Sequence, residues 1–218
     1  MKNSFLQKPF RYVYRSVTFW IIGINVFVFF LVNAFGNTTL VNLLPLNSIL
    51  IITRGTVWQF LTYMFVHADI THLLFNMLAL LIFGIQLEKR MGSWEFLLFY
   101  LLTGVLAGIF SFFAYLLLGV PAIFLFGASG AVMAVMFGFV MYFPDSVVYL
   151  MGLLPIKATL LVILYTGLEI FLQLFSKGGG AAHLTHLAGF GFAFLYFLIR
   201  IGINPIDIFK GGRTRFWN

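Results

Sequence analysis

The chain has 218 residues, of which 62% are hydrophobic and only 9% are charged, so it contains too much apolar material for one soluble core and too little charge to cover it. There is no cysteine, which excludes disulfides, thiolate nucleophiles and metal sites built on cysteine. The net charge of +7 comes from basic residues at the ends of apolar segments, which indicates membrane topology and excludes a nucleic-acid-binding face.

Charged residues divide the chain into apolar segments, each close to the ~20 residues that a membrane-spanning helix needs. One run without charge is too long for a single helix, and Pro121 divides it. The pattern predicts an all-α polytopic membrane protein, a bundle of six transmembrane helices. These are expected at 18–35, 70–87, 96–119 and 127–143, between Lys157 and Lys177, and at 181–199.

The basic residues predict the orientation of these helices. With six spans, one side of the membrane receives only Arg54 and Lys177, so both termini are expected to be cytoplasmic. We expect a short basic cytoplasmic N-terminus at 1–17, the membrane domain at 18–203 and a basic cytoplasmic tail at 204–218. The residues assigned to the cytoplasmic side are Lys2, Lys8, Arg11, Arg15, Lys89, Arg90, Lys157, Arg200, Lys210, Arg213 and Arg215.

The first apolar run also fits a signal peptide, because Arg15 gives it a basic start and residues 32–34 loosely fit a cleavage site. We favour a retained helix, since the run is long for a signal peptide and its removal leaves an odd number of spans. The connection at 36–62 is long and amphipathic. It is predicted to lie in the membrane interface, with Trp58 as an anchor.

The rare polar groups of the even-numbered helices share one depth. Each of these helices enters from the outer side, and near that end lie His72 and Asn76, Ser129, and His183 and His186. Polar and ionisable groups inside spans are costly and face a protein interior or a water-filled cavity. The pattern therefore predicts a shared cavity that opens to the outer face.

Small residues recur at four-residue spacing on the fourth and sixth helices. Gly130 begins such a ridge beside Ser129, and Gly189 shares a helix face with His186. Small residues allow helix backbones to approach closely. Contact between these ridges would bring Ser129 within hydrogen-bond reach of His186.

This juxtaposition has the parts needed for nucleophilic catalysis, because a histidine near neutral pH can take the proton of a serine hydroxyl. The backbone N–H of Ser129 lies at a helix start, and His72 and Asn76 add side-chain donors for an oxyanion. No acidic third member is evident, since Glu169 in the fifth segment is expected to bond a loop near its outer end. The sequence predicts a Ser–His dyad that requires no cofactor and no metal.

The same polar residues also fit structural roles or a metal site. Singly, a serine between glycines indicates helix packing and an intramembrane histidine indicates a buried hydrogen bond, but neither role accounts for the shared depth. A zinc-dependent membrane hydrolase is the chief rival, with His183 and His186 joined by His67 or His72 in a three-histidine site. No acidic residue is expected beside them and there is no HExxH motif. A transporter is disfavoured by the absence of an internal repeat.

Four segments, in order, resemble the rhomboid family of intramembrane serine proteases: WQFLTYMFVHADITHLLFNM (58–77), LEKRMGS (87–93), GASGAV (127–132) and AHLTHLAGFGFA (182–193). The resemblance covers roughly residues 15–203. It implies a six-helix bundle in a lipid bilayer, with a water-filled cavity open to the outer face. It also implies substrates that are transmembrane proteins, cut near the outer ends of their membrane segments, and a bacterial cytoplasmic membrane as the location.

By this resemblance, Ser129 is the nucleophile and His186 the general base. His72 and Asn76 match the side-chain oxyanion donors, which the backbone N–H of Ser129 joins. Relatives that bind membrane helices without cutting them typically lack the serine or the histidine, and this chain has both. The resemblance therefore implies an active serine-type endopeptidase.

The supporting positions agree with the family pattern in part. Gly127 and Gly189 match motif glycines two before the serine and three after the histidine. Many members carry an aromatic residue four positions after the serine, where this chain has Met133, and an arginine after the tryptophan of the outer loop, where it has Gln59. A thioether still contacts an imidazole ring, but a looser contact and a less firmly held outer loop are expected.

Overall fold

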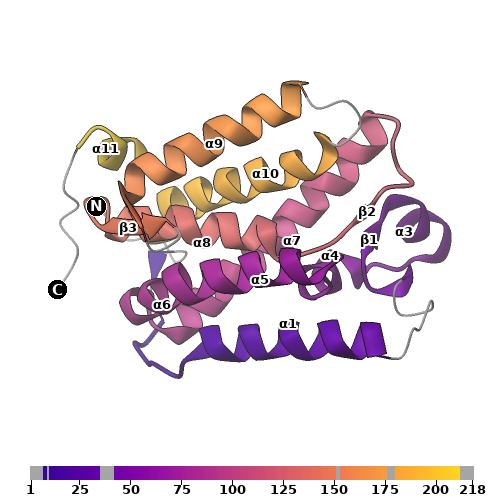
Figure 1. Ribbon diagram of the computed structural model, residues 1–218, viewed down its shortest axis with the longest axis horizontal. Helices are drawn as coiled ribbons and strands as arrows, with labels where there is room; N and C mark the ends of the chain where they lie inside the picture. The colour runs from indigo at the N-terminus through magenta and orange to yellow at the C-terminus, as the bar shows by residue number, and fades with distance from the viewer. Residues whose placement is uncertain (1–6, 9, 35–41, 151–152, 176–179, 212–218) are drawn as a thin grey trace.

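The computed structural model describes residues 7–8, 10–34, 42–150, 153–175 and 180–211. They are mostly helical, and the long helices pack side by side as one bundle (Figure 1). The main helices of the bundle are α1 (Val17–Ala34), α5 (Ile70–Ala79), α6 (Ile85–Met91), α7 (Ser93–Leu117), α8 (Ser129–Tyr142), α9 (Ala158–Phe175) and α10 (Gly180–Tyr196).

Shorter elements connect and extend these helices. The helical ones are α3 (Ser48–Arg54), α4 (Gln59–Thr62), the 3₁₀ helix η2 (Tyr63–Phe65), the π-helices η3 (Leu80–Gly84) and η4 (Phe197–Ile201), and α11 (Pro205–Phe209). The strands form two antiparallel pairs, β1 (Leu46–Asn47) with β2 (Phe124–Leu125) and β3 (Val147–Leu150) with β4 (Leu154–Lys157).

Every one of the six predicted apolar segments contains a helix. Four helices are long and apolar enough to cross a membrane, namely Ile70–Met91, Ser93–Leu117, Ala158–Phe175 and His183–Ile201, and the apolar helices Val17–Asn33 and Ser129–Tyr142 are shorter. The prediction of a polytopic helical membrane protein is therefore confirmed. The count of six spans stays a prediction.

Several elements have no counterpart among the predictions. The β3–β4 hairpin joins α8 to α9, and α11 lies within the predicted tail at 204–218, whose residues 212–218 are outside the described part of the chain. The second predicted helix is not regular, because η3 separates α5 from α6. η3 lies in an apolar segment, where composition indicates burial in lipid or protein but does not distinguish an α-helix from a π-helix.

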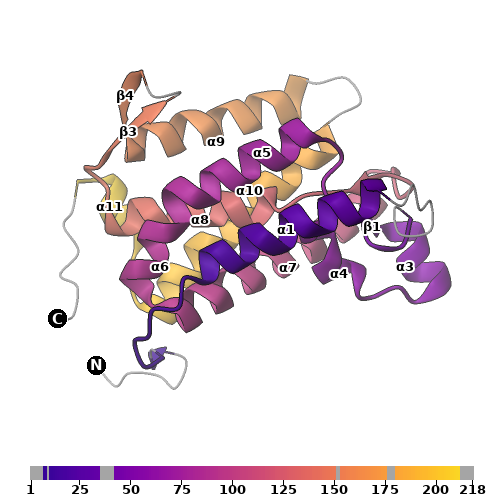
Figure 2. The ribbon, with the colours of Figure 1, turned by 60° about the horizontal axis from the view of Figure 1, so that its bottom comes forward.

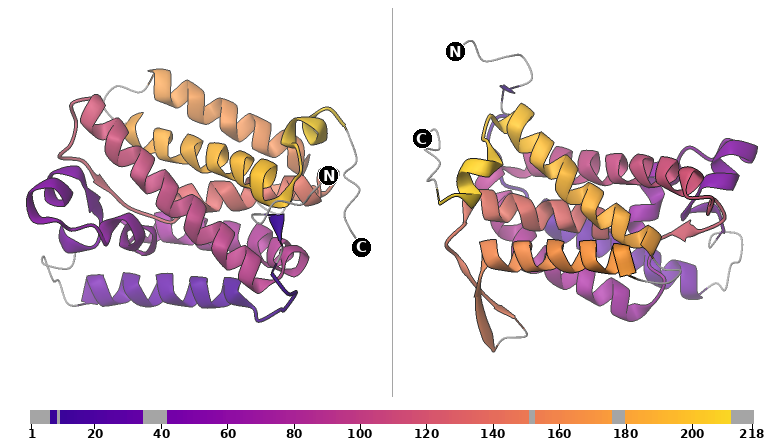
Figure 3. Two further views of the ribbon diagram at one scale, coloured as in Figure 1. Left: turned by 180° about the vertical axis from the view of Figure 1, so that it is seen from behind. Right: turned by 90° about the horizontal axis from the view of Figure 1, so that it is seen from above.

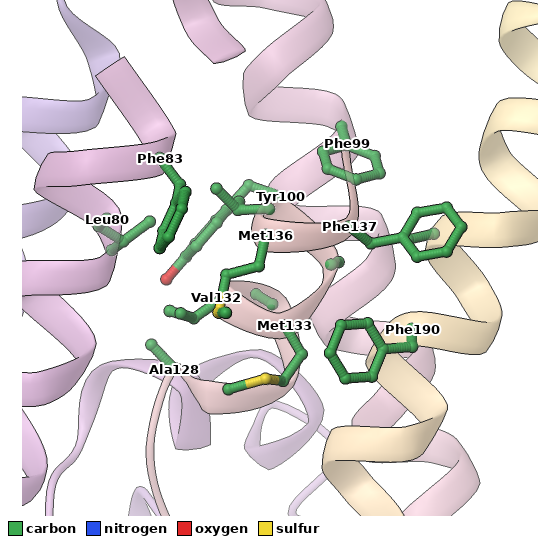
Figure 4. Packing of buried hydrophobic residues seen from close by; sticks show 14 of the residues in the cluster. Leu80, Phe83, Phe99, Tyr100, Ala128, Val132, Met133, Met136, Phe137 and Phe190 are labelled. Atoms are coloured by element: carbon green, nitrogen blue, oxygen red, sulfur yellow. The ribbon is translucent and has the colours of Figure 1, made fainter. Parts of the chain in front are cut away.

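Helix α8 lies in the middle of the bundle, among α5, α7 and α10 (Figures 1 and 2). Every residue from Ser129 to Met141 is buried, so this helix needs no polar face. Figure 4 shows the α8 side chains between Leu80 and Phe83 of η3 on one side and Phe190 of α10 on the other. The short central helix that carries the candidate serine is thus enclosed by protein along its whole length.

The two ends of the bundle differ in charge. The start of α1, the end of α6 and α11 lie together at one end, and α3, which carries Arg54, lies at the other (Figure 1). At the first end, the buried carboxylate of Glu88 accepts hydrogen bonds from the backbone N–H of Val17 (2.7 Å) and of Thr18 (2.9 Å). This contact fixes the start of α1 against the end of α6 and satisfies N–H groups that a helix leaves unpaired.

Candidate active site

The start of α8 is fixed by the segment that precedes it. Leu125 of β2 pairs with Leu46 of β1, and the N–H of Gly127 donates to the carbonyl of Tyr63 (2.9 Å). Gly127 has φ +102°, and a Cβ added there would lie 2.5 Å from Cε1 of His72. Only glycine meets both conditions, so this position sets the entry into α8 and the distance to His72.

The backbones of α8 and α10 approach closely at two glycines, as the small-residue ridges predict. A Cβ added at Gly189 would lie 2.1 Å from the carbonyl oxygen of Gly130, and one added at Gly130 would lie 3.2 Å from Cγ2 of Thr185. Within this contact, Nε2 of His186 lies 2.8 Å from Oγ of Ser129. The predicted proximity of serine and histidine is thus present.

A second contact fixes α10 beside the histidine. The hydroxyls of Ser111 on α7 and Thr185 on α10 lie 2.6 Å apart, and both side chains are fully buried. Thr185 immediately precedes His186, so this hydrogen bond limits rotation of α10 about its own axis. The sequence did not single out either residue, because buried hydroxyls are ordinary in membrane helices.

The first turn of α8 offers unpaired backbone donors. The helix begins at Ser129, and its N-cap residue Ala128 makes no side-chain capping bond. The N–H of Val132 donates a hydrogen bond to the carbonyl of Ala128 (2.9 Å). The N–H groups before Val132 have no intrahelical acceptor. The first of them belongs to Ser129 itself, and such donors can stabilise the negative charge that develops on a carbonyl oxygen when a hydroxyl attacks the carbonyl carbon.

His72 and Asn76 lie one turn apart on α5, facing this region to different degrees. The ring of His72 lies against Gly127 and interacts electrostatically with His186. Asn76 is 5% exposed, and its Nδ2 donates to the carbonyl of His72 (2.8 Å). This bond uses one of the two amide hydrogens of Asn76.

His67 supports His72 from the loop before α5. The two rings meet edge to face, with centroids 5.1 Å apart. Burial lowers the pKa of His67 to about 4, and the charge on His72 adds to this effect while Asp69 opposes it. His67 is therefore neutral near pH 7 and adds no positive charge to the site.

Helix α9 supplies a carboxylate that the sequence did not predict at the site. Oε2 of Glu169 accepts a hydrogen bond from Nδ1 of His183 (2.6 Å) and lies 3.1 Å from Nδ1 of His186. The expectations that Glu169 bonds a loop and that no acidic residue lies beside these histidines are both wrong. Glu169 lies two turns before the end of α9, and His183 lies in the first turn of the antiparallel α10. The two residues therefore lie at a similar depth in the bundle, and this similarity could have identified them as partners.

Glu169, His183 and His186 also form a candidate metal-binding group, since their ligand atoms all lie within 4.8 Å of one another. Histidine with carboxylate is a donor set that zinc accepts. However, the 2.6 Å contact between His183 and Glu169 is shorter than the ~3.3 Å between two ligands of a tetrahedral zinc ion with bonds of ~2.0 Å. His183 and Glu169 are hydrogen-bonded to each other, and metal binding would require them to separate.

The outer loop is tied down through Gln59, at the position where the family pattern has arginine. Gln59 is fully buried, accepts from the N–H of Asn47 (3.0 Å) and donates to the carbonyl of Leu43 (3.2 Å). Trp58 donates to the same carbonyl (3.0 Å) while its ring stays half exposed. Gln59 therefore holds the loop by two hydrogen bonds of its own. The other departure, Met133, is buried in the core of the bundle.

Comparison with known proteins gives a consistent result. The profile of the Rhomboid domain matches residues 54–202. The chain is 36% identical to rhomboid protease GluP of Bacillus subtilis over 102 residues. This alignment covers 44% of this chain and 20% of that protein. It is 31% identical over 172 residues to rhomboid-related protein 1 of Caenorhabditis elegans, 70% of this chain and 44% of that protein. It is 33% identical over 149 residues to rhomboid-related protein 2 of Mus musculus, 64% of this chain and 46% of that protein. The matches thus span less than half the length of each of these three relatives.

Proposed function

The chain belongs to the rhomboid family, and on this premise we propose that it is an intramembrane serine endopeptidase that hydrolyses peptide bonds in or near the transmembrane segments of other membrane proteins. The observation that carries the proposal is the 2.8 Å contact between Nε2 of His186 and Oγ of Ser129, made between two buried helices. Cleavage of a membrane-anchored reporter by the purified protein in liposomes tests it.

The proposed reaction is acyl transfer through Ser129. As Oγ attacks the carbonyl carbon of the substrate, its proton moves to Nε2 of His186, and that proton then passes to the nitrogen of the departing amine. A water molecule next loses a proton to His186 and attacks the acyl carbon. Oγ of Ser129 leaves and regains its proton, which restores the site.

The negative oxygen of each tetrahedral intermediate needs hydrogen-bond donors. We assign this role to the backbone N–H of Ser129, with His72 and Asn76 as side-chain donors. The support is the uncapped start of α8 and the contact of the His72 ring with Gly127. Such donors act on charge that develops in the transition state and so raise turnover more than binding.

Asn76→Ala is accordingly expected to lower kcat by up to ~10²–10³-fold while KM changes little. The measurement is steady-state cleavage of the reporter in liposomes. Asn33→Ala is a matched control, because the Asn33 amide makes the same bond one turn back along its own helix, to Phe29 on α1 (2.8 Å). A normal kcat in Asn76→Ala would remove Asn76 from the proposed site.

The membrane placement is proposed from the helices and the charges. We assign six spans by including α1 and α8 with the four long helices, and we place the basic end and both termini in the cytoplasm. Residues 18–203 then form the membrane domain, between a basic N-terminus at 1–17 and a basic tail at 204–218. The cytoplasmic membrane of a bacterium is the proposed location.

The short length of α8 supports a buried site that is open to the outer face. Its 14 residues extend ~21 Å at 1.5 Å each, less than the ~30 Å of the bilayer core. The non-helical segment before it, including β2, would then lie at membrane depth, which is tolerated where protein or a water-filled cavity surrounds it. Ser129 would lie below the outer surface, within reach of both water and a membrane substrate.

A zinc-dependent hydrolase is a second candidate, because Glu169, His183 and His186 form a possible donor set. The two candidates differ in their response to a strong chelator. Under the serine mechanism, reporter cleavage is expected to survive the chelator unchanged, since Ser129 and His186 carry the reaction. Loss of cleavage with the chelator, together with recovery on adding zinc, would favour the metal mechanism.

A further inference from the structure

The carboxylate of Glu169 is the charged group of the site that a serine–histidine pair leaves unexplained. Its side chain is 4% exposed, although α9 is the least buried of the four long helices. An ionisable residue within a membrane span is costly and is retained where it has a partner and a function. Two of the partners that the structure gives Glu169, His183 and His186, are on α10, the helix of the proposed base.

The geometry places Ser129 and Glu169 at opposite nitrogens of one imidazole ring. Nε2 of His186 lies 2.8 Å from Oγ of Ser129, and Nδ1 lies 3.1 Å from Oε2 of Glu169. This is the order of a serine, histidine and carboxylate triad, in which the carboxylate orients the ring and stabilises its charged form. The three residues come from α8, α10 and α9, and Figure 3 shows these helices from behind and from above.

The contact between Glu169 and His186 is electrostatic more than directional. Nδ1 of His186 is buried and has no aligned hydrogen-bond partner among the described residues. Oε2 of Glu169 is instead aligned with Nδ1 of His183, at 2.6 Å. His183 thus holds the carboxylate in place, one turn before His186 on the same helix.

Other titratable groups around His186 do not duplicate this charge. They are His183 on its own helix, His72 on α5, which interacts with it electrostatically, and Tyr165 on α9, which interacts with Glu169. Histidines and an ordinary phenol carry no negative charge near neutral pH. Within the described residues that face His186, Glu169 is the source of negative charge.

We propose that Glu169 is a positioning residue for His186: its carboxylate, held by His183, stabilises the imidazolium that forms when His186 accepts the proton of Ser129. The inference rests on the proposed function and deepens it, since it adds a third helix, α9, to the reacting unit. It accounts for the carboxylate and for the hydrogen bond of His183 together. Neither is required by a mechanism of two residues.

The test compares Glu169→Gln with Gln173→Leu in liposomes. Glu169→Gln keeps the shape and removes the charge, and Gln173→Leu is a matched change of a polar side chain one turn further along α9. Loss of a well-aligned triad carboxylate costs ~10⁴-fold in kcat. For this less aligned contact we expect Glu169→Gln to lower kcat by roughly 10²-fold at unchanged KM, and Gln173→Leu to have little effect.

The pH dependence separates a charge effect from a packing effect. Removing a negative charge beside His186 makes its protonation harder, so the acid limb of the kcat/KM profile is expected at lower pH in Glu169→Gln. Glu169→Asp keeps the charge but withdraws it by one methylene. Glu169→Asp is expected to lower kcat, while the acid limb stays close to that of the unchanged protein. If Glu169→Gln does not fold, Glu169→Asp is used in its place.

If Glu169→Gln folds and its kcat and pH profile are unchanged, the inference is overturned. If Glu169→Gln does not fold, an unchanged kcat in Glu169→Asp overturns the inference. Equal losses in Glu169→Gln and Gln173→Leu, without a shift of the acid limb, assign the effect to packing of α9 and overturn it too. In either case the unchanged protein still reacts at Ser129 with a fluorophosphonate, so the proposed function stands. If the unchanged protein does not react at Ser129, the function and the inference both fail.

Discussion

Ser129→Ala and His186→Ala are each expected to abolish cleavage of a membrane-anchored reporter, with kcat reduced by about 10⁴-fold or more. The first change removes the nucleophile and the second removes the group that accepts its proton. Their side chains meet at 2.8 Å, so each variant disables the same step. The double variant is therefore expected to be no worse than either single one.

Ser111→Ala is the matched control for the serine. Ser111 is also a buried intramembrane serine, and its hydroxyl bonds Thr185, the residue before His186. Its loss removes a packing contact of α10 but no proposed reacting atom, so substantial activity is expected to remain. All three variants should elute as folded protein in detergent. Full cleavage by either Ser129→Ala or His186→Ala would contradict the proposed mechanism.

Gly189→Ala is expected to have the largest effect on stability. The added Cβ would lie 2.1 Å from the carbonyl oxygen of Gly130, and a backbone atom cannot move aside as a flexible side chain does. Separating α8 from α10 would cost about 3 kcal/mol or more, at the upper end for overpacked cores. It would also pull His186 away from Ser129, so activity and stability are expected to fall together.

Gly191→Ala supplies the comparison for this prediction. Gly191 lies two residues further along α10, with no atom within 4 Å of an added Cβ. There the substitution is expected to be neutral or to stabilise the helix by ~0.5–1 kcal/mol, since alanine loses less conformational entropy than glycine. Thermal unfolding in detergent measures both variants. Equal midpoints for the two would show that the contact of Gly189 with Gly130 does not hold α10 against α8.

The sequence predicted the positions of the main helices well, for a clear physical reason. Lipid excludes charge, so charged residues mark where apolar segments end, and every predicted segment contains a helix. The same constraint located Ser129 and His186, because polar groups at one depth tend to share a cavity. The small-residue ridges then predicted the close approach of α8 and α10 at Gly130 and Gly189, which the structure contains.

Glu169 shows where prediction from the sequence failed. Its place within an apolar segment was evident, but its partners depend on how α9 is rotated against α10, and periodicity cannot determine that rotation when most faces of a helix are apolar. Two observations could have identified it. Glu169 is the one charged residue between Lys157 and Lys177, and its depth matches that of His183 in the next, antiparallel helix.

Gln59 makes contacts that the sequence did not predict. The departure from the family pattern at this position predicts a less firmly held outer loop, and that comparison with arginine stays a prediction. In the structure the amide bonds two backbone groups instead, the N–H of Asn47 and the carbonyl of Leu43. Such pairings depend on where a loop folds back, and a single substituted position does not reveal this.

The most direct test of the central claim, that Ser129 is an activated nucleophile, is labelling of the purified protein by a fluorophosphonate probe. This reagent forms a covalent bond with a serine oxygen that a neighbouring base has activated. We predict that the unchanged protein is labelled on Ser129, that Ser129→Ala is not labelled, and that Ser111→Ala is labelled normally. Absence of labelling in the unchanged protein, or equal labelling of Ser129→Ala, would contradict the claim.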